Sequence, residues 1–260
     1  MQPRKILIAG ETWISNKVDV KGFSAYSTSS YGVGLTELVA ALEECGHSVE
    51  HIPNHEAVET FPWDVGRASE HDVIMLSDIS ADTLQIHPNC FDRGQRTPDR
   101  LRVVRDYVAA GGGLIMVGGY MSFSGIEGKA HYQATPLADV LPVGMIGFDD
   151  RVETPEGVTP RVVEGCESHE VLAGIDGVWP HFLGYNRLLP KPGGDVLMTV
   201  EGEPFLAVGS YGAGRVAAFA SDCSPHWGSP DFLAWPHYGR FWGQLVDWLG
   251  AGSRQPVTAA

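Results

Sequence analysis

Short apolar runs alternate with amphipathic stretches through the first half of the sequence, and this alternation most constrains the fold. Four runs are typical of buried strands: KILIAG (5–10), SVEHIP (48–53), HDVIMLSDI (71–79) and GLIMVGG (113–119). Residues 34–46 and 97–113 have apolar side chains at helical spacing, with Thr97 as the expected N-cap of the second helix. Strands that alternate with helices predict a parallel sheet with helices on both faces, joined by right-handed crossovers.

The second half of the sequence is less regular but ends in clear elements. PFLAVGSYG (204–212) and GRVAAFASD (214–222) flank a glycine-rich turn and predict a C-terminal hairpin. GRFWGQLVDWLG (239–250) predicts the last helix. We therefore expect a single α/β domain over residues 1–252 and a disordered tail over 253–260.

The charge balance excludes several classes of partner. The chain has 260 residues and a formal net charge of -14, so nucleic acid and anionic membranes would repel it. No apolar run approaches the roughly 18 residues that a membrane span requires. The N-terminal MQPRKILIAG leads directly into a strand pattern and not into a signal peptide. These features predict a cytoplasmic protein.

The cysteines give little sign of metal or redox chemistry. The four cysteines (45, 90, 166 and 223) are far apart and form no CxxC pair, so a zinc knot or a redox dithiol is not expected. Only Cys223 has polar neighbours, and a small buried side chain is the favoured interpretation of it.

No glycine-rich segment has a phosphate-binding pattern. We expect no cofactor and name no metal ligand.

Polar and aromatic side chains gather where the predicted strands end. Ligands of open parallel sheets bind beyond the carboxyl ends of the strands. Four segments are expected there: GETWISNKVDVKGF (10–23), SDIS (77–80), GGYMSFSGIEGKAHY (118–132) and SDCSPHWGSPDFLAWPHYGRFW (221–242). Their composition suits a pocket for a small polar ligand.

Three residues are candidates for catalysis. Asp222 follows a predicted strand and His226 lies four residues on, and a carboxylate beside an imidazole supports acid–base chemistry or metal ligation. The alternative is that Asp222 caps a turn and His226 makes a structural hydrogen bond. Glu11, directly after the first strand, is a second candidate acid, with a turn or cap role as its alternative.

Other residues of these segments are candidates for ligand binding. Aromatic rings could stack on the face of a sugar, or could pack the loops instead. Lys129 and Arg240 could hold an anionic group, although single cations are more often surface charges. The candidates are Trp13, Phe23, Asp78, Tyr120, Ser122, Lys129, Trp227 and Arg240.

Three motifs give the chain a family resemblance. GETW with KGF, GGGLIMVGGYMSFSGIEGKAHYQATPLADVLPV and SDCSPHWGSPDFLAWPHYGRFWGQLVDWL span nearly the whole chain. The sequence resembles a glutamine amidotransferase-like family within the class I glutamine amidotransferase-like superfamily, related to ThuA-type trehalose-utilisation proteins. This resemblance implies a flavodoxin-like three-layer sandwich with a mainly parallel central sheet.

The resemblance also places an unsuitable residue at the expected nucleophile. Class I amidotransferases have a cysteine at a sharp strand-to-helix turn, activated by a histidine and a glutamate, and GGYMSFSG puts Tyr120 at that position. A phenol with a pKa of about 10 is a poor acyl acceptor beside a thiolate. Ser122 and Ser124 lack a G-x-S-x-G frame. We therefore expect no glutaminase activity.

Two functions remain open from the sequence. The first is a protein that binds or acts on a small polar metabolite, such as a carbohydrate derivative, without a cysteine nucleophile. The alternative is a non-catalytic binding or assembly module that retains the fold. A homo-oligomer is compatible with either function.

Overall fold

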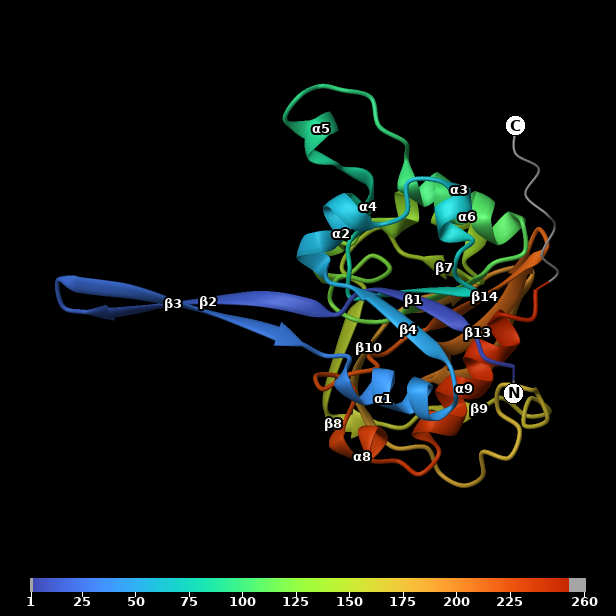
Figure 1. Cartoon of the computed structure of the whole chain (residues 1–260). Helices are drawn as coiled ribbons and strands as arrows, with labels where there is room; N and C mark the ends of the chain where they lie inside the picture. The colour runs from blue at the N-terminus through green and yellow to red at the C-terminus, as the bar shows by residue number, and fades with distance from the viewer. Residues whose placement is uncertain (1, 253–260) are drawn as a thin grey trace.

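The protein is built around one mixed sheet, seen in a computed structural model that describes residues 2–252 (Figure 1). The predicted tail, 253–260, lies outside the described residues. The sheet has eight strands in the order β4-β1-β5-β6-β14-β13-β12-β9. Their bounds are β4 Ser48–Ile52, β1 Lys5–Gly10, β5 Val73–Ser77, β6 Gly113–Val117, β14 Gly214–Phe219, β13 Glu203–Tyr211, β12 Gly194–Val200 and β9 Arg161–Val162.

The first five strands of this order run parallel, and the rest pair antiparallel. In chain order the parallel part reads 2-1-3-4-5, which is the doubly wound flavodoxin-like order. The predicted α/β class, the mainly parallel sheet and the C-terminal hairpin of β13 and β14 are thus confirmed.

Helices cover both faces of the sheet (Figure 1). α1 (Thr36–Glu44) and α9 (Tyr238–Leu249) pack together on one face, and α3 (Val65–Ala68), α4 (Ala81–Gln85) and α6 (Arg100–Ala109) cover the other with α2 (Asn54–Thr60). The shorter helices are α5 (Pro88–Phe91), α7 (Leu137–Val140) and α8 (Pro230–Leu233). Two small sheets pair β8 (Arg151–Val158) with β10 (Phe182–Asn186), and β7 (Val143–Met145) with β11 (Leu188–Pro190).

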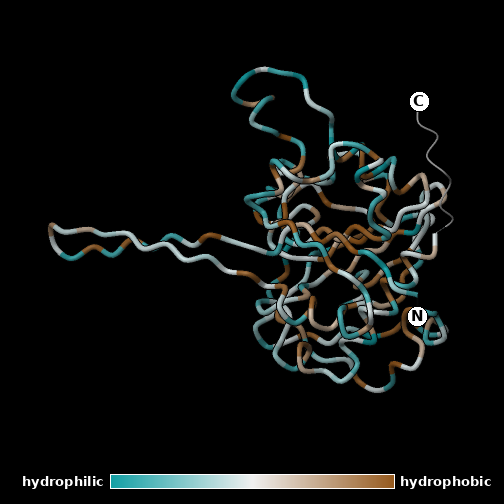
Figure 2. The backbone as a smooth tube through the Cα atoms, viewed as in Figure 1, coloured by the Kyte–Doolittle hydropathy of each residue, from teal (hydrophilic) through white to brown (hydrophobic). Residues whose placement is uncertain are grey.

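The central strands form the core because they are apolar on both sides. Every residue of β5 and β6 is buried, as expected for parallel strands covered on two faces. Figure 2 shows the hydrophobic colour concentrated along these strands. No helix among the described residues is long and apolar enough to cross a membrane.

Two local predictions were wrong. α6 is capped by Asp99 and not by Thr97, because the Asp99 carboxylate accepts a hydrogen bond from the backbone N–H of Leu101. Residues 10–23 were expected to line the crevice, and Glu11 and Trp13 of this segment do so. The rest of it forms, with residues 24–33, a long antiparallel hairpin of β2 (Thr12–Lys21) and β3 (Ser24–Val33) that projects from the body (Figure 1). We call this hairpin the arm.

The register of the two strands and the turn between them explain the shape of the arm. Ten residue pairs are in register, and Gly22 has φ of +62° at the first position of the two-residue turn, as in a type II′ turn. Phe23 therefore lies at the tip, fully exposed and far from the crevice in which it was predicted.

Candidate functional site

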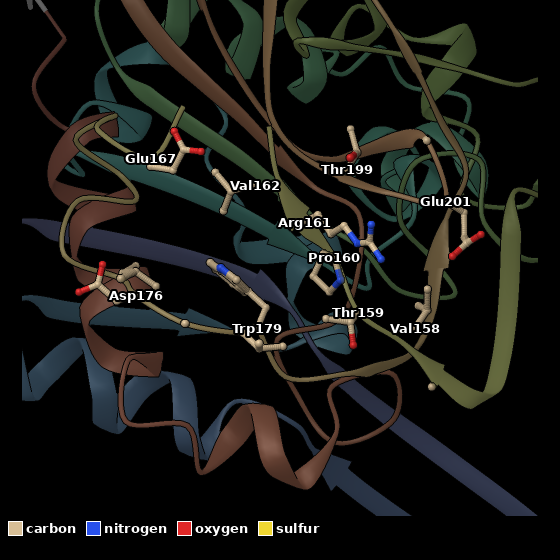
Figure 3. A pocket seen from close by; sticks show the side chains of 15 residues that line it. Val158, Thr159, Pro160, Arg161, Val162, Glu167, Asp176, Trp179, Thr199 and Glu201 are labelled. Carbon is tan, nitrogen blue, oxygen red and sulfur yellow. The ribbon is translucent and has the colours of Figure 1, made fainter. Parts of the chain in front are cut away.

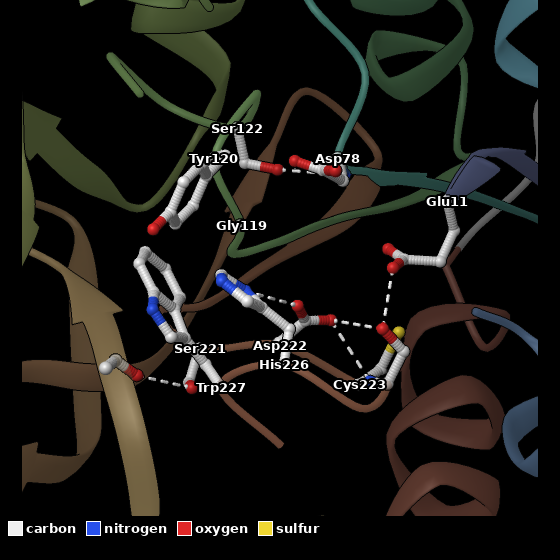
Figure 4. Close-up of polar contacts among 12 residues, drawn as sticks. Glu11, Asp78, Gly119, Tyr120, Ser122, Ser221, Asp222, Cys223, His226 and Trp227 are labelled. Carbon is white, nitrogen blue, oxygen red and sulfur yellow. Dashed lines mark hydrogen bonds and ion pairs between the residues drawn. The ribbon is translucent and has the colours of Figure 1, made fainter. Parts of the chain in front are cut away.

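A crevice opens where four parallel strands end. The loops after β1, β5, β6 and β14 enclose about 390 Å³, lined by Glu11, Trp13, Asp78, Tyr120, Asp222, Ser224, Pro225 and His226. β1 and β5 are neighbours in the sheet. The chain passes from β1 to β4 on one side of this pair and from β5 to β6 on the other side, so the two crossovers lead in opposite directions. The crevice therefore lies at the topological switch point, where ligands of doubly wound sheets bind (Figure 4).

Backbone geometry fixes the two acids at the switch point. Glu11 follows β1 with φ of +54°, and Asp78 follows β5 with φ of +44°. A Cβ on Gly10 would lie 1.8 Å from the carbonyl oxygen of Ser77, so only glycine allows the two strand ends to approach this closely. Non-glycine residues in left-handed conformations are strained, and such strain gathers at functional sites.

Glu11 and Asp222 share a hydroxyl group. The Ser224 Oγ lies 2.7 Å from Oε1 of Glu11 and 2.9 Å from Oδ1 of Asp222 (Figure 4). Ser77 Oγ donates to the other oxygen of Glu11 at 2.6 Å. A serine hydroxyl has one proton and cannot donate to both carboxylates. Both contacts are satisfied as hydrogen bonds when one of the two acids carries a proton of its own.

Of the two acids, Glu11 is the one on which burial favours a proton. The residue is 2% exposed. Burial raises the pKa of Glu11 well above its usual value, and the nearby charges of Asp222 and Asp78 raise it further. The Ser224 hydroxyl can donate to either acid, and a neutral Glu11 could in turn donate to Ser224. A chain of hydrogen-bonded groups thus runs from Glu11 through Ser224 to Asp222.

An ion pair extends this chain from Asp222 to His226. Its Nδ1 lies 3.6 Å from Oδ2 of Asp222, and this carboxylate raises the pKa of the imidazole. The ring packs edge-on against Tyr120, at 4.6 Å between centroids, and is stacked on Trp227 at 5.5 Å. The histidine side chain is 44% exposed and faces the crevice, so it can exchange a proton with a ligand.

Tyr120 lies in the tight turn directly after β6, as predicted. Asn186 holds this turn by accepting from the N–H of Gly119 at 2.9 Å and donating to its carbonyl oxygen at 3.2 Å. The Tyr120 hydroxyl donates to Glu153 at 2.7 Å, and the Arg151 guanidinium lies 4.4 Å from the ring centroid. Both contacts fix the phenol as a wall of the crevice.

The turn differs from a strand-to-helix elbow in two respects. The segment that follows contains only short 3₁₀ turns at Ile126–Gly128 and Tyr132–Ala134, so the expected helix is missing from these described residues. In an elbow enzyme the N–H after the nucleophile helps to bind the oxyanion. Here the N–H of Met121 donates to Asp78 at 2.6 Å, so a carboxylate occupies this donor.

Asp78 is itself a perturbed acid. Burial raises its pKa to about 6, although the hydrogen bond from Met121 acts in the opposite direction. The crevice thus contains three carboxyl groups whose charges oppose one another, together with one imidazole.

Four of the remaining candidates lie outside the wall of the crevice. Ser122 is buried beneath the turn, where it donates to the carbonyl oxygen of Val117 and accepts from the N–H of Asp78. Trp227 is buried behind His226 and donates to Glu153 at 3.0 Å. Lys129 forms an exposed ion pair with Glu127, and Arg240 donates to the carbonyl oxygen of Gly174. These side chains support the loops or lie on the surface.

Sequence reasoning missed three residues of the site. Ser224 lies between two candidates in SDCSPH, so its spacing was a usable signal. Glu153 and Arg151 come from β8, a segment without a functional pattern, and only the fold places them beside Tyr120.

Glu11, Asp222 and Cys223 are the described residues whose arrangement comes nearest to a metal site. Their ligand atoms lie within 4.8 Å of one another. Burial raises the pKa of the Cys223 thiol well above its usual value, and a protonated thiol is a poor ligand.

A larger cavity lies on another side of the molecule. It encloses about 1090 Å³ beside β9 and the residues 175–179 (Figure 3). Its titratable side chains, which are Arg161, Glu167, Asp176 and Glu201, are all exposed. Without a buried titratable side chain it has less acid–base chemistry to offer than the smaller crevice.

The strand order and the crevice at the switch point define a flavodoxin-like α/β protein with a polar site. The chain belongs to the family described as "Putative glutamine amidotransferase", whose model matches residues 5–251. This membership confirms the resemblance found in the sequence motifs.

Solved structures agree with this assignment. The cytoplasmic protein STM1381 from Salmonella typhimurium LT2 is 41% identical, with a TM-score of 0.90 over 94% of this chain and 99% of that one. The cytoplasmic protein STM3548 from Salmonella typhimurium is 38% identical, with a TM-score of 0.90 over 94% and 98%. A beta-galactosidase from Rahnella sp. R3 is similar in fold alone, at 15% identity and a TM-score of 0.50 over 81% of this chain and 25% of that one. No curated protein matches the sequence.

Proposed function

We propose that this protein binds a small polar metabolite, such as a carbohydrate derivative, in the crevice and acts on it by acid–base chemistry. The chain of contacts that runs by hydrogen bonds from Glu11 through Ser224 to Asp222, and by an ion pair from Asp222 to His226, supports this proposal. Neutral Glu11 holds a proton at one end, and the imidazole exchanges one at the other. Pairs of titratable groups with separated pKa values are the usual basis of acid–base catalysis.

The lining of the crevice favours a neutral ligand rich in hydroxyl groups. Carboxylates accept hydrogen bonds from hydroxyls, and the rings of Trp13 and Tyr120 offer faces on which a sugar can stack. No lysine or arginine is among the eight residues that line the crevice, so an anionic ligand is disfavoured. Since two relatives are described as cytoplasmic proteins, we place this chain in the cytoplasm as well.

The same geometry argues against glutamine hydrolysis. Tyr120 takes the position of the expected nucleophile, and Asp78 occupies the N–H of Met121 that would bind an oxyanion. Cys223 is fully buried with a raised pKa, so it is a poor replacement.

A thermal-shift screen of sugars, sugar acids and other polar metabolites tests the binding proposal. A ligand at 100 times its Kd stabilises the native state by about 2.7 kcal/mol, which raises Tm by roughly 5–10 °C in a chain of this size. We expect Glu11→Gln and His226→Ala to lose most of this shift. The exposed Glu164→Gln is the matched control and should keep it. If no compound shifts the native protein, or if all variants respond alike, the crevice is not a ligand site and a non-catalytic assembly module is the better interpretation.

Ammonia release from glutamine tests the second part of the proposal. We expect no release above the background rate. Release that thiol alkylation abolishes would contradict the acid–base assignment and would point to Cys223.

A further inference from the structure

The arm is an amphipathic ribbon with two distinct faces. The register places Ile14, Val18 and Val20 of β2 on the same face as Tyr31 and Val33 of β3. This face carries no charged side chain. The opposite face carries the three charged residues of the arm, which are Lys17, Asp19 and Lys21. Alternation of this kind is typical of a strand pair with one face buried.

The apolar face is uncovered in the isolated chain. From Trp13 to Val33 every residue is exposed except Asp19 and Gly32, which are half-buried. A two-stranded hairpin by itself is marginally stable in water, and large exposed apolar patches mark contact surfaces. Figure 1 shows the arm extending well beyond the body, and Figure 2 shows hydrophobic positions recurring along it. A regular arm of this length is therefore expected to have a covering partner.

Charge indicates what this partner is. The arm carries two lysines and one aspartate, whereas the whole chain has a net charge of -14. The net negative charge of the chain repels an anionic membrane and also a second copy as a whole, whereas the weakly basic arm is locally attracted to the acidic body of that second copy. Two uncharged apolar faces can also pack against each other without burying an unpaired charge.

The root of the arm offers a place for the tip of another arm. A hollow of about 260 Å³ lies between the arm and α2, lined by Thr12, Trp13, Ile14, Tyr31, Asn54, His55, Val58 and Thr83. The fully exposed Phe23 is a matching apolar anchor at the tip. Ten residues of strand span about 33 Å, so the tip cannot reach the root of its own arm. Two arms of equal length that pair antiparallel bring each tip to the root of the other.

We propose that two copies of this chain dimerise through their arms, which pack antiparallel on their apolar faces with Phe23 of each copy in the hollow at the root of its partner's arm. The contact is isologous, and such twofold contacts are the commonest in homo-oligomers. Trp13 lines both this hollow and the candidate crevice. Dimerisation therefore places the tip of the partner beside the site and fixes the tryptophan that forms one of its walls.

Sedimentation velocity and light scattering over a range of concentrations test the proposal. We expect a dimer for the native chain and a monomer for Val18→Asp and Phe23→Asp, because each variant places a charge in an apolar contact. Thr28→Asp introduces the same charge on the opposite face of the arm and is the matched control. The control should remain dimeric. A native chain that is monomeric at about 100 μM, or that stays dimeric with both Asp substitutions, would overturn the inference.

Cross-linking tests the antiparallel arrangement. The double variant Phe23→Cys with Val58→Cys, in a background with the exposed Cys90 replaced by serine, should form a disulfide-linked dimer on mild oxidation. Neither single variant should form a disulfide-linked dimer. Equal cross-linking of the Phe23→Cys single variant would show that the tips meet each other and not the roots, which contradicts the proposed arrangement.

Discussion

At the scale of single residues, three physical constraints meet at Glu11. It is buried, lies in a left-handed backbone conformation and is hydrogen-bonded to two serines. Burial, together with the two other acids that share the crevice, favours the neutral form of this carboxyl group and raises its pKa. The acid is retained at a cost to stability, as is common at functional sites.

The pH dependence of folding tests this view of Glu11. A group whose pKa is raised in the folded state binds more protons when folded, so its contribution to stability is present below the unfolded pKa of about 4.3 and is lost as pH rises. We expect the free energy of unfolding to fall less steeply above pH 5 in Glu11→Gln than in the native chain. The difference is at most about 1.4 kcal/mol per pH unit. Urea unfolding between pH 5 and 8 measures it, with Glu164→Gln as control, and equal slopes in all three proteins would show that Glu11 is ionised.

At the scale of elements, Arg100 joins three helices on one side of the sheet. The residue begins α6 and is fully buried. Its guanidinium donates to the carbonyl oxygens of Leu84 at 2.6 Å and Ala57 at 2.9 Å, and also to those of Val58 and Thr83. These carbonyls belong to α2 and α4. The ring of Trp63 lies 5.0 Å from the guanidinium, and burial lowers the pKa of Arg100 to about 10.

Removal of this side chain should be strongly destabilising. We expect Arg100→Ala to lower the free energy of unfolding by at least about 3 kcal/mol, because it leaves several buried carbonyls without a donor. Arg102→Ala, two positions along the same helix, removes an exposed ion pair with Asp99 and should cost less than about 1 kcal/mol. Urea unfolding of both variants gives the comparison. Similar losses in the two variants would mean that water replaces the guanidinium.

At the scale of the whole molecule, an acidic body and a weakly basic arm are joined at the edge of the crevice. The arm begins at Thr12, directly after Glu11, so the proposed dimer contact and the proposed site share a stretch of chain. A second copy that orders the arm would also order the start of β2.

Thermal unfolding at different protein concentrations tests this coupling. A dimer that dissociates on unfolding has a Tm that rises with protein concentration, because association stabilises the native state by mass action. We expect such a rise between about 1 and 100 μM for the native chain and none for Val18→Asp. If the Tm of both proteins is independent of concentration, the arms do not contribute to stability.

The sequence by itself determined the central strands, the fold class and the acids at the strand ends. Apolar runs indicate burial, because a strand that helices cover on both faces consists almost entirely of apolar residues. Glu11, Asp78 and Asp222 were identified because each follows such a run. Tyr120 was placed correctly for the same reason, since glycines that follow an apolar run mark the end of a strand.

Only the tertiary structure decided which of these residues act together. Ser224 and Glu11 are 213 positions apart, and their hydrogen bond exists because β1 and β14 end at the same edge of the sheet. Hydrogen bonds between distant segments leave no periodic signal, so Glu153 and Arg151 could not be found from their own neighbourhoods. The arm could not be predicted for a different reason. Its alternation of apolar and polar residues was present in the sequence, but this periodicity indicates only that one face is apolar and not whether the body of the protein covers that face.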